Sequence, residues 1–310
     1  MKGHFTQGVA VLLERPASLD EIESRLDSFH VVARREPAEE WAMGGPTLLV
    51  EYRPQANGYL SVDVVDRPWP DHMGDPKQEP MVFGAWSMGH FGPFAFPGNL
   101  QRAAEHCWAW EPARTIADPH QAFLRIRASY VFGAGGDAPL FPKDYDPIAE
   151  LRFVTDVAVA LLELPGAICC FNPNGELLRG RDEMVAGLVH ARANDVPPLD
   201  VWSNVRLFRL PGDWTMMDTV GMWQLDVPDH EACFPPDSYD CNEVDNFLRN
   251  AGFYVMQHGE VIEDGDTMDG PAGVRWQAKT MNEGLAPPPR EIIRWLPCDG
   301  SDVPPQLLGE

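Results

Sequence analysis

Long apolar runs are absent from this chain of 310 residues. A membrane-spanning helix needs about 18 or more consecutive apolar residues, and no window of the sequence reaches that length. The first residues, MKGHFTQGVAVLLERP, contain only a short apolar run before Glu14 and Arg15, and no small-residue cleavage site follows it. We therefore expect a cytoplasmic protein with no membrane partner.

The positions of the cysteines argue against a disulfide framework and against a zinc site. The six cysteines show neither a C-x-x-C spacing nor a cluster with histidine. In a chain without a secretory signal, this pattern predicts reduced and mostly buried thiols rather than a disulfide framework or a zinc site. We expect no structural metal.

Basic residues are few. The chain has 24 Lys and Arg against 47 Asp and Glu, which gives a formal net charge of -23. A direct nucleic-acid partner is excluded because phosphate contacts need clustered Lys and Arg. The negative charge either keeps the protein soluble or speeds its encounter with a basic partner, and the total alone does not separate these two uses.

The acidic excess is concentrated in the last third of the chain. Residues 195–310 contain 21 acidic and 7 basic residues, whereas residues 1–194 contain 26 and 17. Between residues 226 and 269, twelve Asp or Glu stand against one basic residue, Arg249. We name residues 226–269 the acidic segment, and its one-sided charge points to a surface that another protein binds.

The first two thirds of the chain predict strands and helices in alternation. Apolar, β-branched residues 5–13 predict a strand, and Ser18 with Glu21 three residues later forms a capping box before a helix whose apolar face runs to Phe29. Further strands are expected at residues 47–52, 59–65, 123–132 and 167–171, and further helices at 146–164 and 181–193, with a short helix that Asn99 caps and that runs to Trp110.

Residues 67–97 have no steady period and are rich in proline, glycine and aromatic residues. This composition predicts an ordered loop that is anchored by its aromatic side chains. The aromatics are either buried or form an exposed patch for a partner, and we favour burial.

The last third predicts a second unit. Strands at residues 204–210 and 214–219 pair about the turn Pro211-Gly212-Asp213, a helix covers 242–256, a short strand lies at Val261, and segments at 276 and 290–295 complete the sheet before a polar tail. Pro197-Pro198 marks the boundary between an N-terminal α+β region (1–196), which contains up to two β-α-β units, and an acidic C-terminal α+β domain (197–310). The expected class is α+β, with two α/β-sandwich-like units of mixed or antiparallel sheets flanked by helices.

No catalytic or metal motif is complete. His230-Glu231 lacks the second histidine of a zinc hydrolase, and neither Asp226, Asp229 and Glu231 nor the run Glu263-Asp264-Gly265-Asp266 has the ligand spacing of a calcium loop. No serine lies in a G-x-S-x-G elbow. We therefore expect no catalytic residue, no cofactor and no metal, and we keep as an alternative a hydrolase that uses Asp218 or Asp229 with His230.

Several segments of the last third resemble a known but uncharacterised bacterial family. These are WSNVRLFRL, WTMMDTVGMWQLDVPDHEACF, VDNFLRNAGFYVMQHGEVIEDGDTMDGP and PPPREIIRWLP. They are similar to the family named domain of unknown function 4261, over residues 202–297. The elements that carry the resemblance are Asp218-Thr-Val-Gly-Met222, Leu225 to Glu231 and Asp264 to Thr267. The resemblance implies no established activity.

The whole chain also resembles TsiT-like immunity proteins, which are encoded beside type VI secretion effectors. This resemblance implies a stoichiometric inhibitor that holds a toxin, expected to be a nuclease with a basic surface, inactive in the cytoplasm. An adaptor or chaperone that loads the effector is a further alternative. We expect the partner to contact these acids: Asp226, Asp229, Glu231, Asp237, Asp240, Glu243, Asp245, Glu263, Asp264, Asp266 and Asp269.

Overall fold

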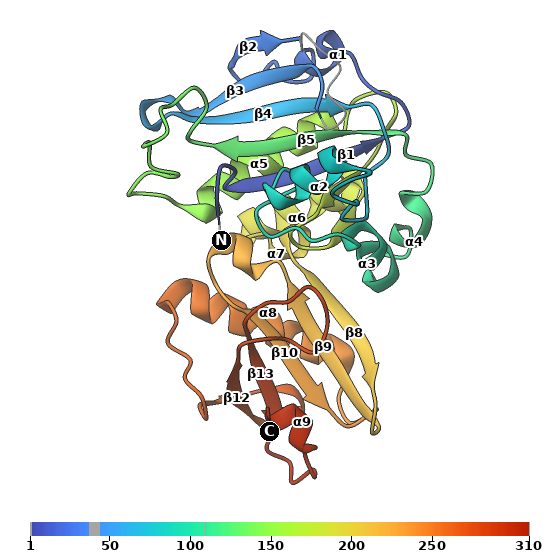
Figure 1. The fold of residues 1–310 in the computed structure, drawn as a ribbon. Helices are drawn as coiled ribbons and strands as arrows, with labels where there is room; N and C mark the ends of the chain where they lie inside the picture. Colours follow the sequence, from blue (N-terminus) through green and yellow to red (C-terminus); the bar gives the residue numbers. More distant parts are fainter. Residues whose placement is uncertain (1, 37–43, 109, 310) are drawn as a thin grey trace. The chain divides into compact units, whose positions relative to one another are not determined.

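The computed structural model describes residues 2–36, 44–108 and 110–309 (Figure 1). The chain divides into two compact units, one that ends at Trp202 and one that begins at Ser203. The boundary between the units lies a few residues after Pro197-Pro198, because the short helix α7 (Leu199–Trp202) packs into the N-terminal unit. There the Trp202 indole N–H donates a hydrogen bond to Thr155 Oγ1 at 2.8 Å.

The N-terminal unit is built on a seven-stranded antiparallel sheet, in the order β2-β3-β4-β5-β1-β6-β7. Its strands are β1 (Gln7–Leu13), β2 (Val31–Arg35), β3 (Thr47–Arg53), β4 (Gly58–Val65), β5 (Ala122–Ser129), β6 (Ala167–Asn172) and β7 (Leu177–Arg179). Between β3 and β4, the turn η1 (Pro54–Ala56) ends at Asn57, whose φ of 58° is a backbone conformation that Asn tolerates. The strands predicted at 5–13, 47–52, 59–65, 123–132 and 167–171 are confirmed.

Three predicted helices form where they were expected: α1 (Leu19–Glu23), α5 (Pro147–Leu161) and α6 (Arg181–Asn194). Both hydrogen bonds of the Ser18–Glu21 capping box are present. Asp146 caps α5 by accepting hydrogen bonds from the N–H groups of Ile148 and Ala149. The first helix is shorter than predicted, since it ends at Glu23 and leaves Phe29 outside it.

The chain between β4 and β5 covers one face of this sheet. It contains the helices α2 (Pro80–Ser87), within the aromatic-rich residues 67–97, and α3 (Asn99–His106) and α4 (Ala113–Ile116), which follow them. Trp69, Trp86 and Phe91 are buried and pack against one another and against Phe123 and Phe171 of the strands. The predicted burial of these aromatics is confirmed, although α2 was expected to be loop.

Asn99 does not cap α3, contrary to the sequence prediction. The residue is buried, accepts a hydrogen bond from the Trp69 indole at 3.1 Å, and donates one to the Pro173 carbonyl. Asp71 supplies the cap from a distant loop, because its two carboxylate oxygens accept from the N–H groups of Leu100 and Gln101. A cap that comes from 29 residues away has no local sequence signal.

Glu150 on α5 is a buried carboxyl group that makes stability depend on pH. Burial raises the pKa of Glu150 above its usual range, although Tyr145 Oη donates a hydrogen bond to it at 3.0 Å. The folded state therefore keeps this proton when the unfolded chain loses it, so stability falls as pH rises through the ordinary carboxyl pKa of about 4.3. We expect Glu150→Gln to raise the melting temperature at pH 8 by a few degrees.

The same substitution should leave the melting temperature unchanged at pH 3, where the carboxyl is protonated in both states. Differential scanning calorimetry at the two pH values measures this, and Glu14→Gln, an exposed residue of the same unit, is the control. An equal gain at both pH values would show that the effect does not come from ionisation of Glu150.

The C-terminal unit has a six-stranded mixed sheet, in the order β11-β12-β13-β10-β9-β8. Its strands are β8 (Asn204–Leu210), β9 (Trp214–Val220), β10 (Asp229–Phe234), β11 (Thr267–Asp269), β12 (Arg275–Met281) and β13 (Ile292–Pro297). Only the β10–β13 pair is parallel among the strand pairs of this sheet. The long helix α8 (Cys241–His258) packs on one face, over Trp276 and Trp295, which are fully buried.

The α+β class is confirmed, and so are the β8–β9 hairpin, the helix α8 and the two closing strands. Two predictions in this unit were wrong. No strand forms at Val261, and the next strand, β11, begins only at Thr267. The C-terminal residues are more than a polar tail, since α9 (Pro305–Leu308) buries Leu307 beside Met216 and Leu296.

Candidate functional site

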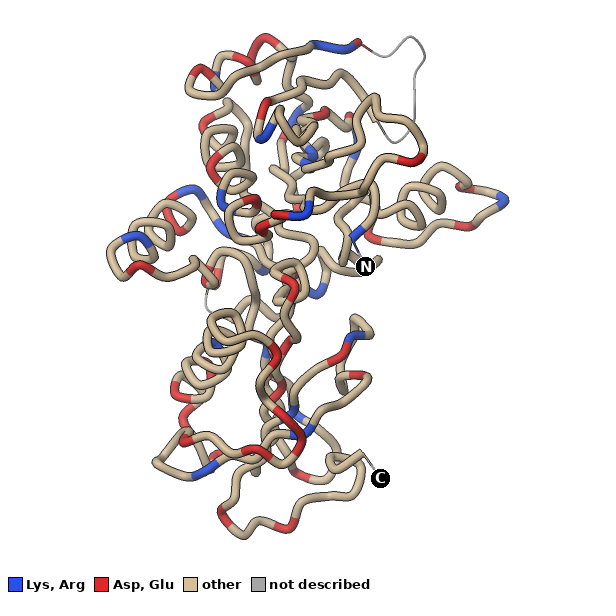
Figure 2. The backbone as a smooth tube through the Cα atoms, turned by 90° about the vertical axis from the view of Figure 1, so that its left-hand side faces the viewer, with Lys and Arg blue, Asp and Glu red and all other residues tan. Residues whose placement is uncertain are grey.

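The structure places the predicted contact acids in two environments. Asp229 and Glu231 are buried, at 1% and 0% exposure, and Asp245 is half-buried beside Arg249 at 3.0 Å. The others are exposed: Asp226, Asp237, Asp240, Glu243, Glu263, Asp264, Asp266 and Asp269. Figure 2 shows acidic positions recurring along the long helix and the loops of the C-terminal unit, where basic positions are few.

A buried network of ion pairs lies within the C-terminal sheet. Asp218 on β9 is fully buried and accepts two hydrogen bonds from Arg206 on β8, at 2.9 and 2.6 Å. The Arg290 guanidinium, from the loop before β13, donates a third at 2.6 Å. Burial acts to raise the pKa of Asp218, but the two guanidiniums outweigh it and hold the pKa below its usual range.

Asp229 connects this pair to the turn that follows β9. Its Oδ1 accepts hydrogen bonds from Thr219 Oγ1 at 2.8 Å and from the Met222 N–H at 3.1 Å, and its Oδ2 lies 3.2 Å from Arg290 Nε. Gly221 adopts a φ of 113°, which suits glycine and brings the start of η2 (Met222–Leu225) back to this carboxylate. Burial raises the pKa of Asp229 despite the neighbouring Arg290.

Glu231 forms a second buried pair, with Arg294 across the parallel ladder. Arg294 Nε donates to Glu231 Oε1 at 2.5 Å, and the Leu285 N–H donates to Oε2 at 2.9 Å. The prediction that Asp229 and Glu231 contact a partner is therefore corrected, because β10 turns both carboxylates into the protein, where arginines neutralise them. We name these six residues, Arg206, Asp218, Asp229, Glu231, Arg290 and Arg294, the buried ion network.

His230 is unsuited to the hydrolase alternative. It is fully buried, its Nδ1 accepts a hydrogen bond from the Trp295 indole at 3.1 Å, and burial lowers its pKa to about 3. The imidazole is therefore neutral at physiological pH and is held by a core tryptophan. None of the three cavities described below is lined by His230 or by the buried ion network. The network is a structural scaffold in this arrangement.

The arginines of the network were missed at the sequence level. Arg294 stands inside the otherwise apolar, fully buried strand IIRWLP, whereas Arg206 stands in NVRLFRL, which also contains Asn204 and Arg209. A charged residue in a strand that is apolar on both sides indicates a buried ion pair, since an unpaired buried charge is costly. That signal was available for Arg294, but it does not select the partner, and it does not apply to Arg290, which lies in a loop, or to Arg206.

The exposed acids at the end of the acidic segment are held in place by backbone groups. The turn from Glu263 to Asp266 is closed by the Glu263 N–H, which donates to Asp266 Oδ2 at 2.8 Å. Asp264 Oδ1 accepts from the Thr280 N–H of β12 at 3.1 Å. These contacts limit the freedom of the Asp264 and Asp266 carboxylates in this exposed turn.

Glu243 and Asp269 lie together at a shallow depression of about 560 Å³ between α8 and η3 (Pro271–Gly273). Asn246 and Asn250 of α8 complete its polar lining. Glu243 Oε2 accepts a hydrogen bond from the Ala272 N–H at 3.1 Å, which fixes the carboxylate at the border of the depression. We name Glu243, Glu263, Asp264, Asp266 and Asp269 the acidic rim.

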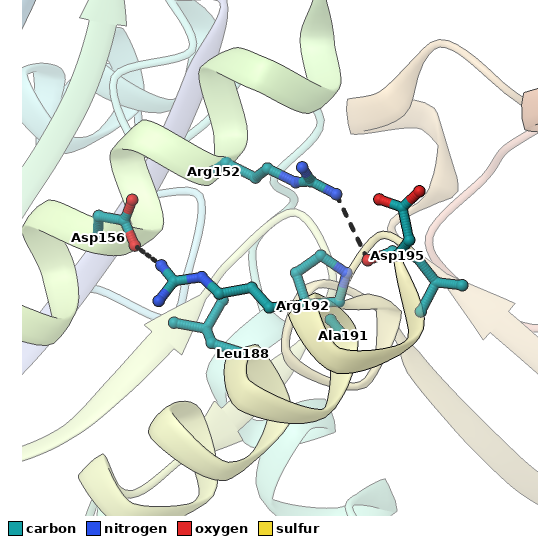
Figure 3. Close-up of a pocket in the computed structure, with 8 residues that line it drawn as sticks. Arg152, Asp156, Leu188, Ala191, Arg192 and Asp195 are labelled. Carbon is teal, nitrogen blue, oxygen red and sulfur yellow. Dashed lines mark hydrogen bonds and ion pairs between the residues drawn. The ribbon is translucent and has the colours of Figure 1, made fainter.

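A cavity of about 180 Å³ lies between α5 and α6 of the N-terminal unit (Figure 3). Its buried part comprises Leu188, Ala191 and Pro198, and Arg192 forms an ion pair with Asp156 at 3.1 Å. Arg152 Nη2 donates to a backbone carbonyl at 3.4 Å. Two arginines and two aspartates line this cavity, so its charge is balanced and favours ions of neither sign.

The cysteines are all free, and four of the six are buried. The prediction that most of the thiols are buried is therefore confirmed. Within residues 2–36, 44–108 and 110–309, no group of three or more His, Cys, Asp or Glu is placed to hold a metal ion. The helices of this described part of the chain are all too short or too polar to cross a bilayer.

The last third of the chain is thus an α+β unit that contains the buried ion network and exposes the acidic rim. Residues 218–296 of this unit match the family model described as Domain of unknown function (DUF4261). The resemblance seen in the sequence is thus confirmed for the part that begins at Asp218 and ends at Leu296. No curated protein and no solved structure matches the chain.

The family elements seen in the sequence have structural explanations here. Asp218 and Thr219 support Arg290 and Asp229, and Glu231 pairs with Arg294. Most of the quoted residues therefore belong to the scaffold. The Asp264–Thr267 element lies instead on the surface, where its Asp264 and Asp266 belong to the acidic rim.

Proposed function

We propose that this protein binds and neutralises a bacterial toxin through the acidic surface of its C-terminal unit. The toxin is a type VI secretion effector, and the protein acts as its immunity partner in the cytoplasm of the producing cell. The observation that supports this proposal is the exposure of eight of the eleven predicted contact acids in a segment with a single basic residue. That residue, Arg249, is itself paired with Asp245.

Charge complementarity supports a nuclease as the toxin. The active surface of a nuclease is basic because it binds phosphate groups, and an acidic surface can occupy it and steer the two proteins together. The acidic rim suits this use, because backbone N–H groups hold Glu243, Asp264 and Asp266 in place before binding. Carboxylates that are already ordered lose less conformational entropy when a partner binds.

The buried ion network supports the same proposal indirectly. It ties β8, β9, β10, β13 and the loop before β13 together, and β10 is itself part of the acidic segment that carries the exposed acids. A rigid support is what a binding surface requires, and the network provides no open site for catalysis among the described cavities.

Co-expression with the effector encoded beside this protein tests the proposal. Cells that make the effector alone should die, and cells that also make this protein should survive and yield a stable complex on purification. The control is a catalytically dead effector, which should bind equally well. Killing that continues in the presence of a complex would replace immunity by an effector-loading adaptor, and the lack of any complex would contradict both.

A further inference from the structure

A second charged group is buried in the N-terminal unit. Asp63 on β4 accepts hydrogen bonds from Arg125 on β5, at 2.5 Å from Nη2, and from Arg127 Nη2 at 2.9 Å. All three residues are at most 8% exposed. We name Asp63, Arg125 and Arg127 the arginine cluster. In contrast to the buried ion network, it places two guanidiniums against one carboxylate.

Arg127 is incompletely paired in this cluster. Its Nε and Nη1 atoms are inaccessible to solvent and have no hydrogen-bond partner among the described residues. Ser61, which stands directly opposite Arg127 in the β4–β5 ladder, has a buried hydroxyl that also lacks a partner there. These are two donor groups on one face of the sheet that have no acceptor, and buried donors of this kind are costly.

The pKa values of Arg127 and of the nearby His90 agree with an excess of positive charge in the arginine cluster. Burial and the neighbouring Arg125 lower the pKa of Arg127 to about 9, although Asp63 opposes them. His90, which packs edge-on against Phe5, has a pKa lowered to about 4 by burial and by the two arginines. His90 is therefore neutral at pH 7, and the cluster carries one excess positive charge that an anion would compensate.

A cavity of about 480 Å³ lies next to the cluster. Residues 3–5 form one wall, and residues 86–89, 92, 93, 95 and 96 contribute the rest. Phe5 separates the cavity from the cluster, since its ring centre lies 4.1 Å from the Arg127 guanidinium carbon. No carboxylate lines the cavity, whereas Trp86, Met88 and Phe96 offer apolar surface.

We propose that this cavity and the arginine cluster together bind a small organic anion. Its carboxylate or phosphate group pairs with Arg127 and Ser61, and its apolar body packs against Trp86 and Phe96. The proposed site requires the Phe5 ring, which lies before β1 and packs against His90 and Phe132, to turn aside when the anion binds. Binding supplies the missing acceptors and the missing negative charge in one step.

Tryptophan fluorescence of the full-length protein tests this site, because Trp86 lines the cavity. The probes are benzoate, phenyl phosphate and inorganic phosphate, each titrated at pH 7 and constant ionic strength. We expect saturable binding of benzoate or phenyl phosphate, and the tighter of the two identifies the anionic group. We expect at least tenfold weaker binding of inorganic phosphate, which lacks an apolar body. Equal binding of all three would overturn the proposal.

Arg127→Met is the decisive variant, because it removes the guanidinium whose Nε and Nη1 lack partners, leaves Asp63 paired with Arg125, and keeps an apolar side chain of similar length. We expect it to weaken binding of the preferred probe at least tenfold while the melting temperature is kept. The matched control is Arg114→Met, an exposed arginine of the same unit, which should bind as the unmodified protein does. If Arg127→Met unfolds, Ser61→Ala provides the same test with a smaller expected loss. No saturable binding of any probe, or unchanged affinity in both cluster variants, would overturn the site.

Discussion

Asp218→Asn should destabilise the C-terminal unit by about 3–5 kcal/mol, the usual consequence of removing one partner from a buried ion pair. Asp218 accepts hydrogen bonds from both Arg206 and Arg290, and all three side chains are at most 3% exposed. The substitution therefore leaves two buried guanidiniums without their main counter-charge. Because native stabilities are of the order of 5–15 kcal/mol, a loss of this size removes much of the total.

Amide hydrogen exchange in increasing urea measures this effect for the C-terminal unit alone, through peptides of β9 and β10. Asp237→Asn is the matched control, since its side chain is 91% exposed and lies 3.6 Å from Arg209 at the surface. It should change stability by less than about 0.5 kcal/mol. Adding Arg206→Met to Asp218→Asn should cost less than the sum of the two single changes, because both charges of one pair are then removed. A loss below about 1 kcal/mol in Asp218→Asn would show that the network is not a main source of stability.

Acid should act on the same network in a predictable direction. The pKa of Asp218 is lower in the folded state, so its contribution to stability is present above the ordinary Asp pKa of about 3.9. That contribution is lost as pH falls through the lowered value. Asp218→Asn should therefore lower stability far more at pH 7 than under strongly acidic conditions.

Removing charge from the acidic segment should slow association with the effector by about tenfold or more at low salt. This prediction rests on the proposed function, and electrostatic steering changes association rates by about 10- to 1000-fold. The suitable combination is Asp226→Asn, Asp237→Asn, Glu263→Lys and Asp269→Lys. Asp226 and Asp237 have φ values of 60° and 59°, a conformation that Asn tolerates well, which is why these two are neutralised rather than reversed.

Stopped-flow association at several salt concentrations measures the effect. The rate for the variant should depend less on salt, because fewer exposed charges remain to be screened. The control has the same change in charge on exposed positions of the N-terminal unit: Glu14→Lys, Glu23→Lys, Asp27→Asn and Asp182→Asn. An on-rate that is unchanged in the first variant, or reduced equally in both, would remove the acidic segment from the recognition step.

Local patterns were sufficient for most of the helices and strands. The capping box at Ser18 depends on residues three positions apart and forms as predicted. The cap at Asp146 and the turn at Asn57 are equally local, since each depends on residues within a few positions of one another. Long-range features could not be found in this way. The cap of α3 comes from Asp71, and β10 pairs in parallel with β13, about 60 residues later in the chain.

The acidic segment shows most clearly what each level of description can determine. The sequence by itself determined the excess of negative charge, the two-unit α+β class and the match of the last third to an uncharacterised family, because these follow from composition and local pattern. Only the tertiary structure decided which acids are available to a partner. Asp229 and Glu231 lie among exposed acids in the sequence, but pairing of β10 with β9 and β13 brings them to arginines from β13 and the loop before it. Burial of these two carboxylates depends on those distant partners, since a buried carboxylate that stays ionised needs an opposite charge beside it.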